Sequence, residues 1–285
     1  MIKVSLIPND FTMDFEAVMK LCQEEHVKYV ELAYMWNKSV LDLTENELSK
    51  VHELMDQAGV KAASIQTQIM KVHLPNSKLS APNSKNMHRD YEYNKSRIVD
   101  AIRMAKEFNC KYIITYSYFT YLVGKKEENW NRLFDDYEEL LKPVSQANKQ
   151  MVVECEGDTY IGSVEDYLRL FTRFNSEHLK ANFDLCNLYS HVHKFNENDV
   201  EKMKPFVEYF HVKDRKKAFL FGSKPAVFGT GNVPWRMALK KFYDMGFDGV
   251  LSVEPHVHGK NRFELGRMCV KNLQSLLNEL NIPFE

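Results

Sequence analysis

The stretch "VEYFHVKDRK" (residues 207–216) decides how this sequence is best interpreted. An apolar run typical of a β-strand ends there in a histidine, a lysine, an aspartate and an arginine. Three other strand-like runs carry acidic side chains near their ends: "MVVECEG" (151–157), "LKANFDLCN" (179–187) and "GVLSVEPH" (249–256). Because the same feature recurs at four strand ends, the four stretches have to be explained together.

Short β-branched or aromatic runs alternate with longer amphipathic segments along the whole chain. This pattern is typical of βαβ units with a parallel sheet. Eight runs are predicted to be strands: 2–7, 29–34, 61–67, 111–117, 150–156, 180–185, 208–213 and 249–255. Eight repeats in 285 residues predict an α/β fold with one closed (β/α)8 TIM barrel, formed by residues 1–285 as a single domain.

Composition excludes several classes of partner. The formal net charge is −1, and Lys and Arg are spread along the chain, so we expect no binding to nucleic acid or to an anionic membrane surface. No apolar run approaches membrane-spanning length. The five cysteines show no CxxC spacing, which favours reduced thiols in a cytoplasmic protein over disulfides or a thiolate zinc site. A small molecule is the expected partner.

Two long polar segments follow predicted strands. Residues 71–94 and residues 216–232 are both predicted to be loops at the C-terminal face of the barrel, where long loops usually cover the site or contact substrate. In the second segment, Phe219, Leu220 and Phe221 are expected either to cover the site or to form a subunit contact in a homo-oligomer. The "GTG" run at 229–231 indicates a plain turn more readily than a phosphate cradle.

Alternation along the strands places the polar side chains of each strand on one face. If the last four strands close the barrel, Glu154, Asp184, His211 and Glu254 meet at its C-terminal end. Three carboxylates in a partly desolvated space repel one another, and a divalent cation would remove that repulsion. Three oxygen donors and one nitrogen donor suit one Mn²⁺, Mg²⁺, Co²⁺ or Zn²⁺ ion.

Further polar residues are candidates for the same site. Glu156 shares a face with Glu154 and competes with it as the ligand from its strand, and His256 follows Glu254 on the same face. Lys213 and Arg215 are predicted to bind a substrate oxyanion or phosphate. We expect Asp214 either to orient a ligand or to pair with a neighbouring cation.

The runs "VVECEG", "NFDLCN", "FHVKD", "GTGNVPW" and "LSVEPH", in this order and spacing, resemble the xylose-isomerase-like sugar phosphate isomerase/epimerase family of (β/α)8 barrels. Glu31, expected after the second strand, is also in keeping with it. The resemblance implies metal ligands at Glu154, Asp184, His211 and Glu254, with Glu154 preferred over Glu156. It also implies that Glu154 and Glu254 act as the catalytic acid/base pair.

The resemblance implies a sugar isomerase or epimerase that transfers a proton through a metal-stabilised enediolate. Ketose 3-epimerases of the family carry a substrate-binding histidine where this sequence has Asn187. The residues expected to bind substrate are Glu156, Asn187, Lys213, Asp214, Arg215 and His256. Two alternatives remain: a lyase, dehydratase or hydrolase acting on a cyclitol or keto-glycoside with the same metal site, and a barrel that binds a sugar without turning it over. Both acid/base residues are present, which argues against the second alternative.

Overall fold

The computed structural model describes residues 1–74, 91–120, 124–190, 195–217 and 222–285. Eight parallel strands close into a barrel in the order β1-β12-β9-β8-β7-β6-β5-β2, and β2 pairs with β1 to close the ring. Their bounds are β1 Lys3–Leu6, β2 Tyr29–Leu32, β5 Lys61–Gln66, β6 Tyr112–Thr115, β7 Gln150–Glu154, β8 Leu179–Asn182, β9 Val207–Val212 and β12 Val250–Val253. The predicted TIM barrel is confirmed, and each predicted strand contains or overlaps one strand of the barrel.

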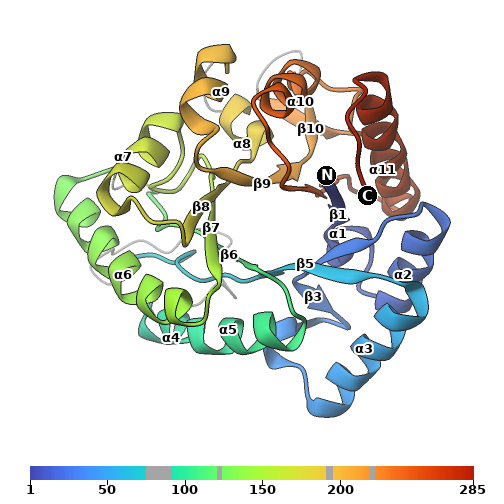
Figure 1. The fold of residues 1–285 in the computed structure, drawn as a ribbon, viewed down its shortest axis with the longest axis horizontal. Helices are drawn as coiled ribbons and strands as arrows, with labels where there is room; N and C mark the ends of the chain where they lie inside the picture. Colours follow the sequence, from blue (N-terminus) through green and yellow to red (C-terminus); the bar gives the residue numbers. More distant parts are fainter. Residues whose placement is uncertain (75–90, 121–123, 191–194, 218–221) are drawn as a thin grey trace.

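Helices surround the barrel, as Figure 1 shows in a view with the strands at the centre. They are α1 Pro8–Phe11, α2 Phe15–Glu24, α3 Glu45–Ala58, α4 Tyr91–Ser96, α5 Ile98–Glu107, α6 Glu127–Gln146, α7 Val164–Phe174, α8 Leu185–Ser190, α9 Glu197–Met203, α10 Trp235–Asp244 and α11 Arg262–Glu279. A 3-10 turn, η1, covers Val40–Asp42. In the described residues, no helix combines the length and the apolar character that crossing a membrane requires.

Local sequence explains where the helices begin and end. In α3, Thr44 caps the N-terminus through a reciprocal pair of hydrogen bonds with Glu47, and Gly59 ends the helix with φ of 68°, a conformation that glycine adopts without steric cost. Helix α11 buries Leu273 and Leu277 against the barrel exterior. The apolar stripes of these helices therefore serve packing.

The two segments predicted to be loops contain regular structure. Residues 91–94 belong to helix α4, because Tyr91 and Lys95 anchor that helix to α6: the Tyr91 hydroxyl and the Lys95 Nζ both contact the carboxylate of Asp136. The polar composition of this segment concealed these buried contacts. Residues 75–90 lie outside the described residues.

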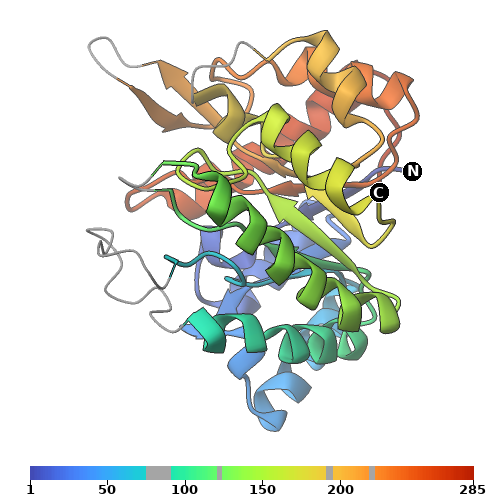
Figure 2. The same cartoon turned by 90° about the vertical axis from the view of Figure 1, so that its left-hand side faces the viewer.

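The second segment contains an antiparallel hairpin of β10 (Asp214–Lys217) and β11 (Ser223–Ala226), which projects from the barrel in Figure 2. The hairpin pairs Lys216 with Lys224 and Lys217 with Ser223, so a paired strand replaces the expected loop at residues 216–217 and 223–226. Phe219, Leu220 and Phe221 lie outside the described residues. A smaller hairpin, β3 (Tyr34–Met35) with β4 (Lys38–Ser39), follows β2.

Candidate functional site

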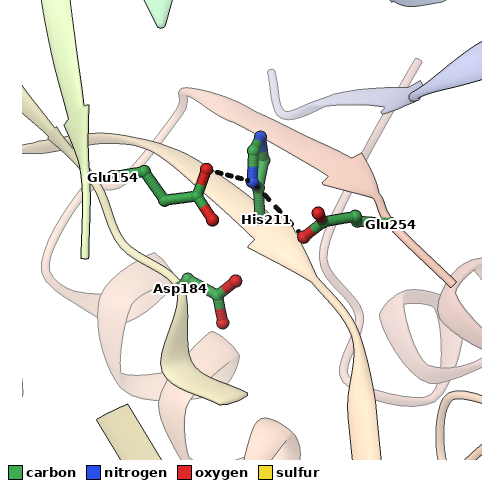
Figure 3. A group of neighbouring side chains, drawn as sticks. All are labelled: Glu154, Asp184, His211 and Glu254. Carbon is green, nitrogen blue, oxygen red and sulfur yellow. Dashed lines mark ion pairs between the residues drawn. The ribbon is translucent and has the colours of Figure 1, made fainter. Parts of the chain in front are cut away.

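Four side chains from four neighbouring strands of the barrel meet at its C-terminal end (Figure 3). Glu154 is the last residue of β7, Asp184 follows β8, His211 lies near the end of β9, and Glu254 follows β12. One ligand atom from each lies within 4.8 Å of the others. His211 Nδ1 is 3.1 Å from Glu154 Oε2 and 3.4 Å from Glu254 Oε2. Glu154 and Glu254 approach the imidazole from opposite sides.

The atoms that face this shared space suit a cation. All four residues are buried. Three of their atoms lie close to charged neighbours but lack a hydrogen-bond partner of good geometry among the described residues: Glu154 Oε2, Asp184 Oδ2 and His211 Nδ1. Buried polar atoms normally find partners, and a metal ion supplies one to carboxylate oxygens and to an imidazole nitrogen together. The donor set fits a divalent cation.

Opposing charges decide the ionisation of the buried acids. Burial raises the pKa of Asp184 to about 6, even though Lys213 acts in the opposite direction. Burial also acts to raise the pKa of Glu254, but the cationic side chains of His256, Lys213 and His211 outweigh it and hold this pKa well below its usual value. The carboxylate of Glu254 therefore stays ionised in a buried site because cationic side chains lie close to it.

Glu31 of β2 orients the imidazole of His211 through the ring nitrogen that points away from the other three clustered residues. Its Oε1 lies 2.9 Å from His211 Nε2, and its Oε2 accepts a hydrogen bond of 2.5 Å from the Tyr209 hydroxyl. Tyr209 in turn lies 2.9 Å from Ser64 Oγ. Burial acts to lower the pKa of His211, but the carboxylates of Glu154, Glu31 and Glu254 outweigh it and raise this pKa well above its usual value, so without a metal both ring nitrogens carry a proton. With a metal at Nδ1, the carboxylate beside Nε2 would keep the proton on that nitrogen and leave the Nδ1 lone pair to the ion. Glu31 lies within the second strand rather than after it, and its carboxylate contacts His211.

Lys213 follows β9 and lies inside the cluster. Its Nζ is 2.6 Å from Asp184 Oδ2, 2.6 Å from Glu254 Oε2 and 3.9 Å from Glu154 Oε1. The side chain was predicted to bind a substrate oxyanion. In this structure its ammonium instead contacts three of the four clustered side chains.

Asn187 and His256 border the cluster on two sides. Asn187 on α8 donates from Nδ2 to the carbonyl of Cys155 at 2.9 Å and to Glu154 Oε1 at 3.4 Å. His256 Nε2 is 2.8 Å from Glu254 Oε1, and its ring is about half exposed. Both candidate substrate-binding residues therefore contact one member of the acid/base pair suggested by the sequence.

Glu156 lies apart from the four clustered residues. The strand ends at Glu154, so alternation no longer holds at Glu156, and its Oε1 pairs with Lys71 Nζ at 2.6 Å. Burial raises the pKa of Glu156 to about 7, against the opposing effect of Lys71. Of the two glutamates that the sequence offered, the structure brings Glu154 into the cluster.

This placement yields a prediction for the open choice between the two glutamates. Glu154→Gln is expected to lose most of the bound divalent metal, because the carboxamide offers a weaker, uncharged ligand. Glu156→Gln, a matched loss of charge at the same end of the barrel, is expected to keep it. Elemental mass spectrometry of both purified variants measures the difference. Metal loss in Glu156→Gln with retention in Glu154→Gln would assign the ligand to the other residue.

Arg215 and Asp214 occupy the β10 end of the hairpin. Arg215 Nη2 donates to the carbonyl of Ser223 at 3.1 Å, across the hairpin. Asp214 neither orients a clustered residue nor pairs with a cation, in the contacts of the described residues. Its carboxylate accepts from four backbone N–H groups, at distances of 2.8 to 3.3 Å: Arg215, Gly229, Gly231 and Val233.

The "GTG" turn is built around Asp214. The amides of Gly229 and Gly231 donate to this carboxylate, so they are not turned toward an external phosphate. A Cβ atom on Gly231 would lie 1.9 Å from Asp214 Oδ1, which explains why a glycine occupies that position. Asp214, which the sequence suggested as a substrate-binding residue, fastens the turn that leads into α10.

We expect Asp214→Ala to lower the free energy of unfolding by about 2–4 kcal/mol, because four amides lose the buried carboxylate that is their acceptor. Chemical denaturation followed by circular dichroism measures the change. Asp244→Ala removes a half-exposed carboxylate at the end of α10 and should change stability by less than about 0.5 kcal/mol. Equal stability of the two variants would contradict the role given to Asp214.

Two charged residues near the site escaped the sequence interpretation. Lys71 lies beyond β5 and pairs with Glu156, and its Nζ is 4.3 Å from the centre of the Tyr116 ring. Asp10 on α1 lies beyond β1, with its Oδ2 3.7 Å from His256 Nε2. Both residues come shortly after a strand of the barrel. A search for charged side chains after the first and third predicted strands would therefore have found them.

Comparison with known proteins supports the fold. No curated protein matches the chain. Among solved structures, a xylose isomerase-like TIM barrel protein from Mycobacterium smegmatis in complex with magnesium is 16% identical, with a TM-score of 0.71, and the match covers 98% of this chain and 96% of that one. D-Psicose 3-epimerase with D-tagatose from Clostridium cellulolyticum H10 is 14% identical, with a TM-score of 0.71 and coverage of 98% of both chains.

A third similar structure is the probable 3-DHS dehydratase AsbF from Bacillus anthracis, which is described as involved in petrobactin synthesis. It is 15% identical, with a TM-score of 0.73, and the match covers 95% of this chain and 98% of that one. The family described as xylose isomerase-like TIM barrel matches residues 19–275, which include all four clustered residues. With its closed barrel and this match over most of its length, the chain belongs to the xylose isomerase-like TIM barrel family.

Proposed function

We propose that this protein is a divalent-metal-dependent isomerase or epimerase that acts on a keto-sugar or a sugar phosphate. One observation carries the proposal: two carboxylates, Glu154 and Glu254, face each other across a buried cluster whose other donors suit a cation. A site that only binds a sugar has no need of two acid/base groups on opposite sides. The similarity to an epimerase structure agrees with this assignment.

Glu154, Asp184, His211 and Glu254 would hold one Mn²⁺, Co²⁺, Mg²⁺ or Zn²⁺ ion. When bound, such an ion polarises a carbonyl oxygen and an adjacent hydroxyl oxygen, which makes the neighbouring C–H more acidic. The family includes a similar structure in complex with magnesium. The choice among the four ions belongs to the proposal.

Glu154 and Glu254 would move the proton. One carboxylate takes the proton from the carbon next to the carbonyl, and the other returns a proton on the opposite face, which inverts that carbon. Each positioned proton transfer contributes roughly 10²–10⁴-fold to the rate. The hydrogen bond from Asn187 to Glu154 and the contact of His256 with Glu254 hold the two carboxylates in position.

Substrate binding would use the polar groups around the cluster. Arg215 supplies a cation for an oxyanion or phosphate, with the planar, bidentate geometry that phosphate favours. Lys213 would reach such a group only after its ammonium leaves Asp184 and Glu254. Asn187, His256 and Glu156 supply hydrogen bonds to hydroxyl groups. Asp214 is the exception among the substrate-binding candidates, because its carboxylate is occupied by backbone amides.

A dehydratase is the second candidate. The similarity to the probable 3-DHS dehydratase supports it, because the same carboxylates can remove a proton and protonate a departing β-hydroxyl. Product analysis separates the two reactions, since isomerisation leaves the mass unchanged and dehydration releases water.

The test is incubation of the Mn²⁺- or Co²⁺-loaded protein with a panel of keto-sugars and their phosphates in D₂O. The proposal predicts deuterium at the carbon beside the carbonyl and a new epimer or isomer, detected by NMR and chromatography. Loss of water from a substrate would support the dehydratase. Binding of a sugar with neither exchange nor a new product would contradict both and favour a sugar-binding barrel.

We also assign residues 1–285 to one domain and the protein to the cytoplasm. All five cysteines are buried and unpaired, which agrees with a reducing compartment. Neither assignment affects the chemistry of the site.

A further inference from the structure

Lys213 is a buried cation at the centre of an acidic cluster. Its side chain is 5% exposed, and the backbone carbonyl of the same residue accepts a hydrogen bond of 2.8 Å from Trp235 Nε1. The base of the side chain is therefore fixed at the end of β9. Its Nζ lies within 4 Å of three carboxylates, those of Glu154, Asp184 and Glu254.

These three carboxylates are the same ones that would hold a divalent cation. Glu254 divides its two oxygens between partners: Oε2 lies 2.6 Å from Lys213 Nζ, whereas Oε1 lies 2.8 Å from His256 Nε2. Oε2 is also the oxygen 3.4 Å from His211 Nδ1, so the ammonium contacts the side of Glu254 that faces the cluster. Asp184 Oδ2, 2.6 Å from the ammonium, is likewise one of the buried atoms without a hydrogen-bond partner of good geometry.

We propose that Lys213 is an internal counter-ion of the carboxylate cluster, which a divalent cation must displace from Asp184 and Glu254 in order to bind. The Lys213 ammonium then has two effects. It stabilises the protein without the ion, and it weakens the affinity for the ion. This inference rests on the metal site of the proposed function. It adds a role for Lys213, whose contacts with Asp184 and Glu254 are not needed for the proton transfers.

Electrostatics gives the direction of both effects. Three buried carboxylates without a counter-ion repel one another, and removing one partner of a buried ion pair is strongly destabilising. The ammonium and the divalent ion carry charge of the same sign, and they compete for the same two oxygens. Part of the binding free energy of the ion is therefore used to break the contacts of Lys213.

Lys71 provides a matched control. It is a second, mostly buried lysine at this end of the barrel, with a side chain 14% exposed, but its Nζ contacts Glu156, which lies outside the cluster. Lys71→Met removes one positive charge from the same region without removing a contact to Asp184 or Glu254.

The experiment compares the native protein, Lys213→Met, Lys213→Gln and Lys71→Met after removal of metal with a chelator. Isothermal titration with Mn²⁺ gives the dissociation constant, and thermal unfolding of the metal-free and Mn²⁺-loaded forms gives the midpoint temperature. We expect Lys213→Met and Lys213→Gln to bind Mn²⁺ at least about tenfold more tightly than the native protein. Their metal-free midpoints should fall, and Mn²⁺ should restore most of the loss. Lys71→Met should change the dissociation constant by less than about threefold.

The outcomes separate this inference from the proposed function. Native protein that binds Mn²⁺, with Lys213 variants that bind it equally or more weakly, would overturn the counter-ion role while leaving the metal site in place. Variants that bind Mn²⁺ when the native protein does not would support the counter-ion role and contradict a metal-dependent native enzyme. Variants that fold only in the presence of Mn²⁺ would also support it, because the ion then replaces the missing ammonium.

Discussion

Glu254→Gln is expected to reduce the rate of deuterium incorporation into a keto-sugar substrate by at least about a thousandfold. Two effects combine in this variant: the carboxamide cannot accept or return a proton at neutral pH, and it is a poorer ligand for a divalent cation. Glu254 Oε2 is 3.4 Å from His211 Nδ1, and Oε1 is 2.8 Å from His256 Nε2. The side chain therefore contacts one clustered residue and one residue beside the cluster. NMR of the substrate in D₂O measures the rate.

Glu264→Gln is the control for this prediction. Glu264 lies in the first turn of α11 and is mostly exposed, so its replacement should leave the exchange rate within about twofold of the native value. A Glu254→Gln variant that retains more than about a tenth of the native exchange rate, with the metal bound, would remove Glu254 from the acid/base pair.

Glu31→Gln is expected to weaken divalent-metal binding by about 10–100-fold without removing any of the four clustered side chains. Glu31 is fully buried, and its Oε1 lies 2.9 Å from His211 Nε2. The amide of a glutamine can present a donor to Nε2, which would favour the tautomer with the proton on Nδ1. That proton would occupy the nitrogen that faces the cluster. Isothermal titration with Mn²⁺ measures the change.

Two further variants test the explanation. Tyr209→Phe removes the hydroxyl that donates to Glu31 Oε2 but keeps the carboxylate on His211, so it should weaken metal binding less than Glu31→Gln does. Glu208→Gln changes a carboxylate on the same strand that pairs with Lys111 rather than with the cluster, and it should not alter the dissociation constant. An unchanged dissociation constant in Glu31→Gln would show that His211 needs no such partner.

The sequence predicted the barrel and the convergence of the four clustered side chains for a simple physical reason. Each side chain lies at the end of a strand whose apolar run is visible in the sequence, and parallel strands place such ends on one face. The choice between Glu154 and Glu156 depended on where β7 ends, and strand ends are the least certain feature of a sequence pattern.

Contacts between distant segments could not be predicted in this way. Three of the four amides that surround Asp214, those of Gly229, Gly231 and Val233, come from the turn that follows the hairpin, so nothing near Asp214 in the sequence indicates that its carboxylate is occupied. The role of Lys213 is a similar case. An exposed lysine after a strand would reach substrate, and only the distances to Asp184 and Glu254 show that its ammonium lies among the acids.

The metal content of the native protein is the most direct test of the central claim that the four clustered residues form a metal site. Elemental mass spectrometry of purified protein, before and after incubation with Mn²⁺ and Co²⁺, should give about one equivalent of a divalent metal per chain, and Glu254→Gln should retain much less. Absence of any bound metal in the native protein after incubation with either ion would contradict the account and leave the cluster neutralised by Lys213 and His211 alone.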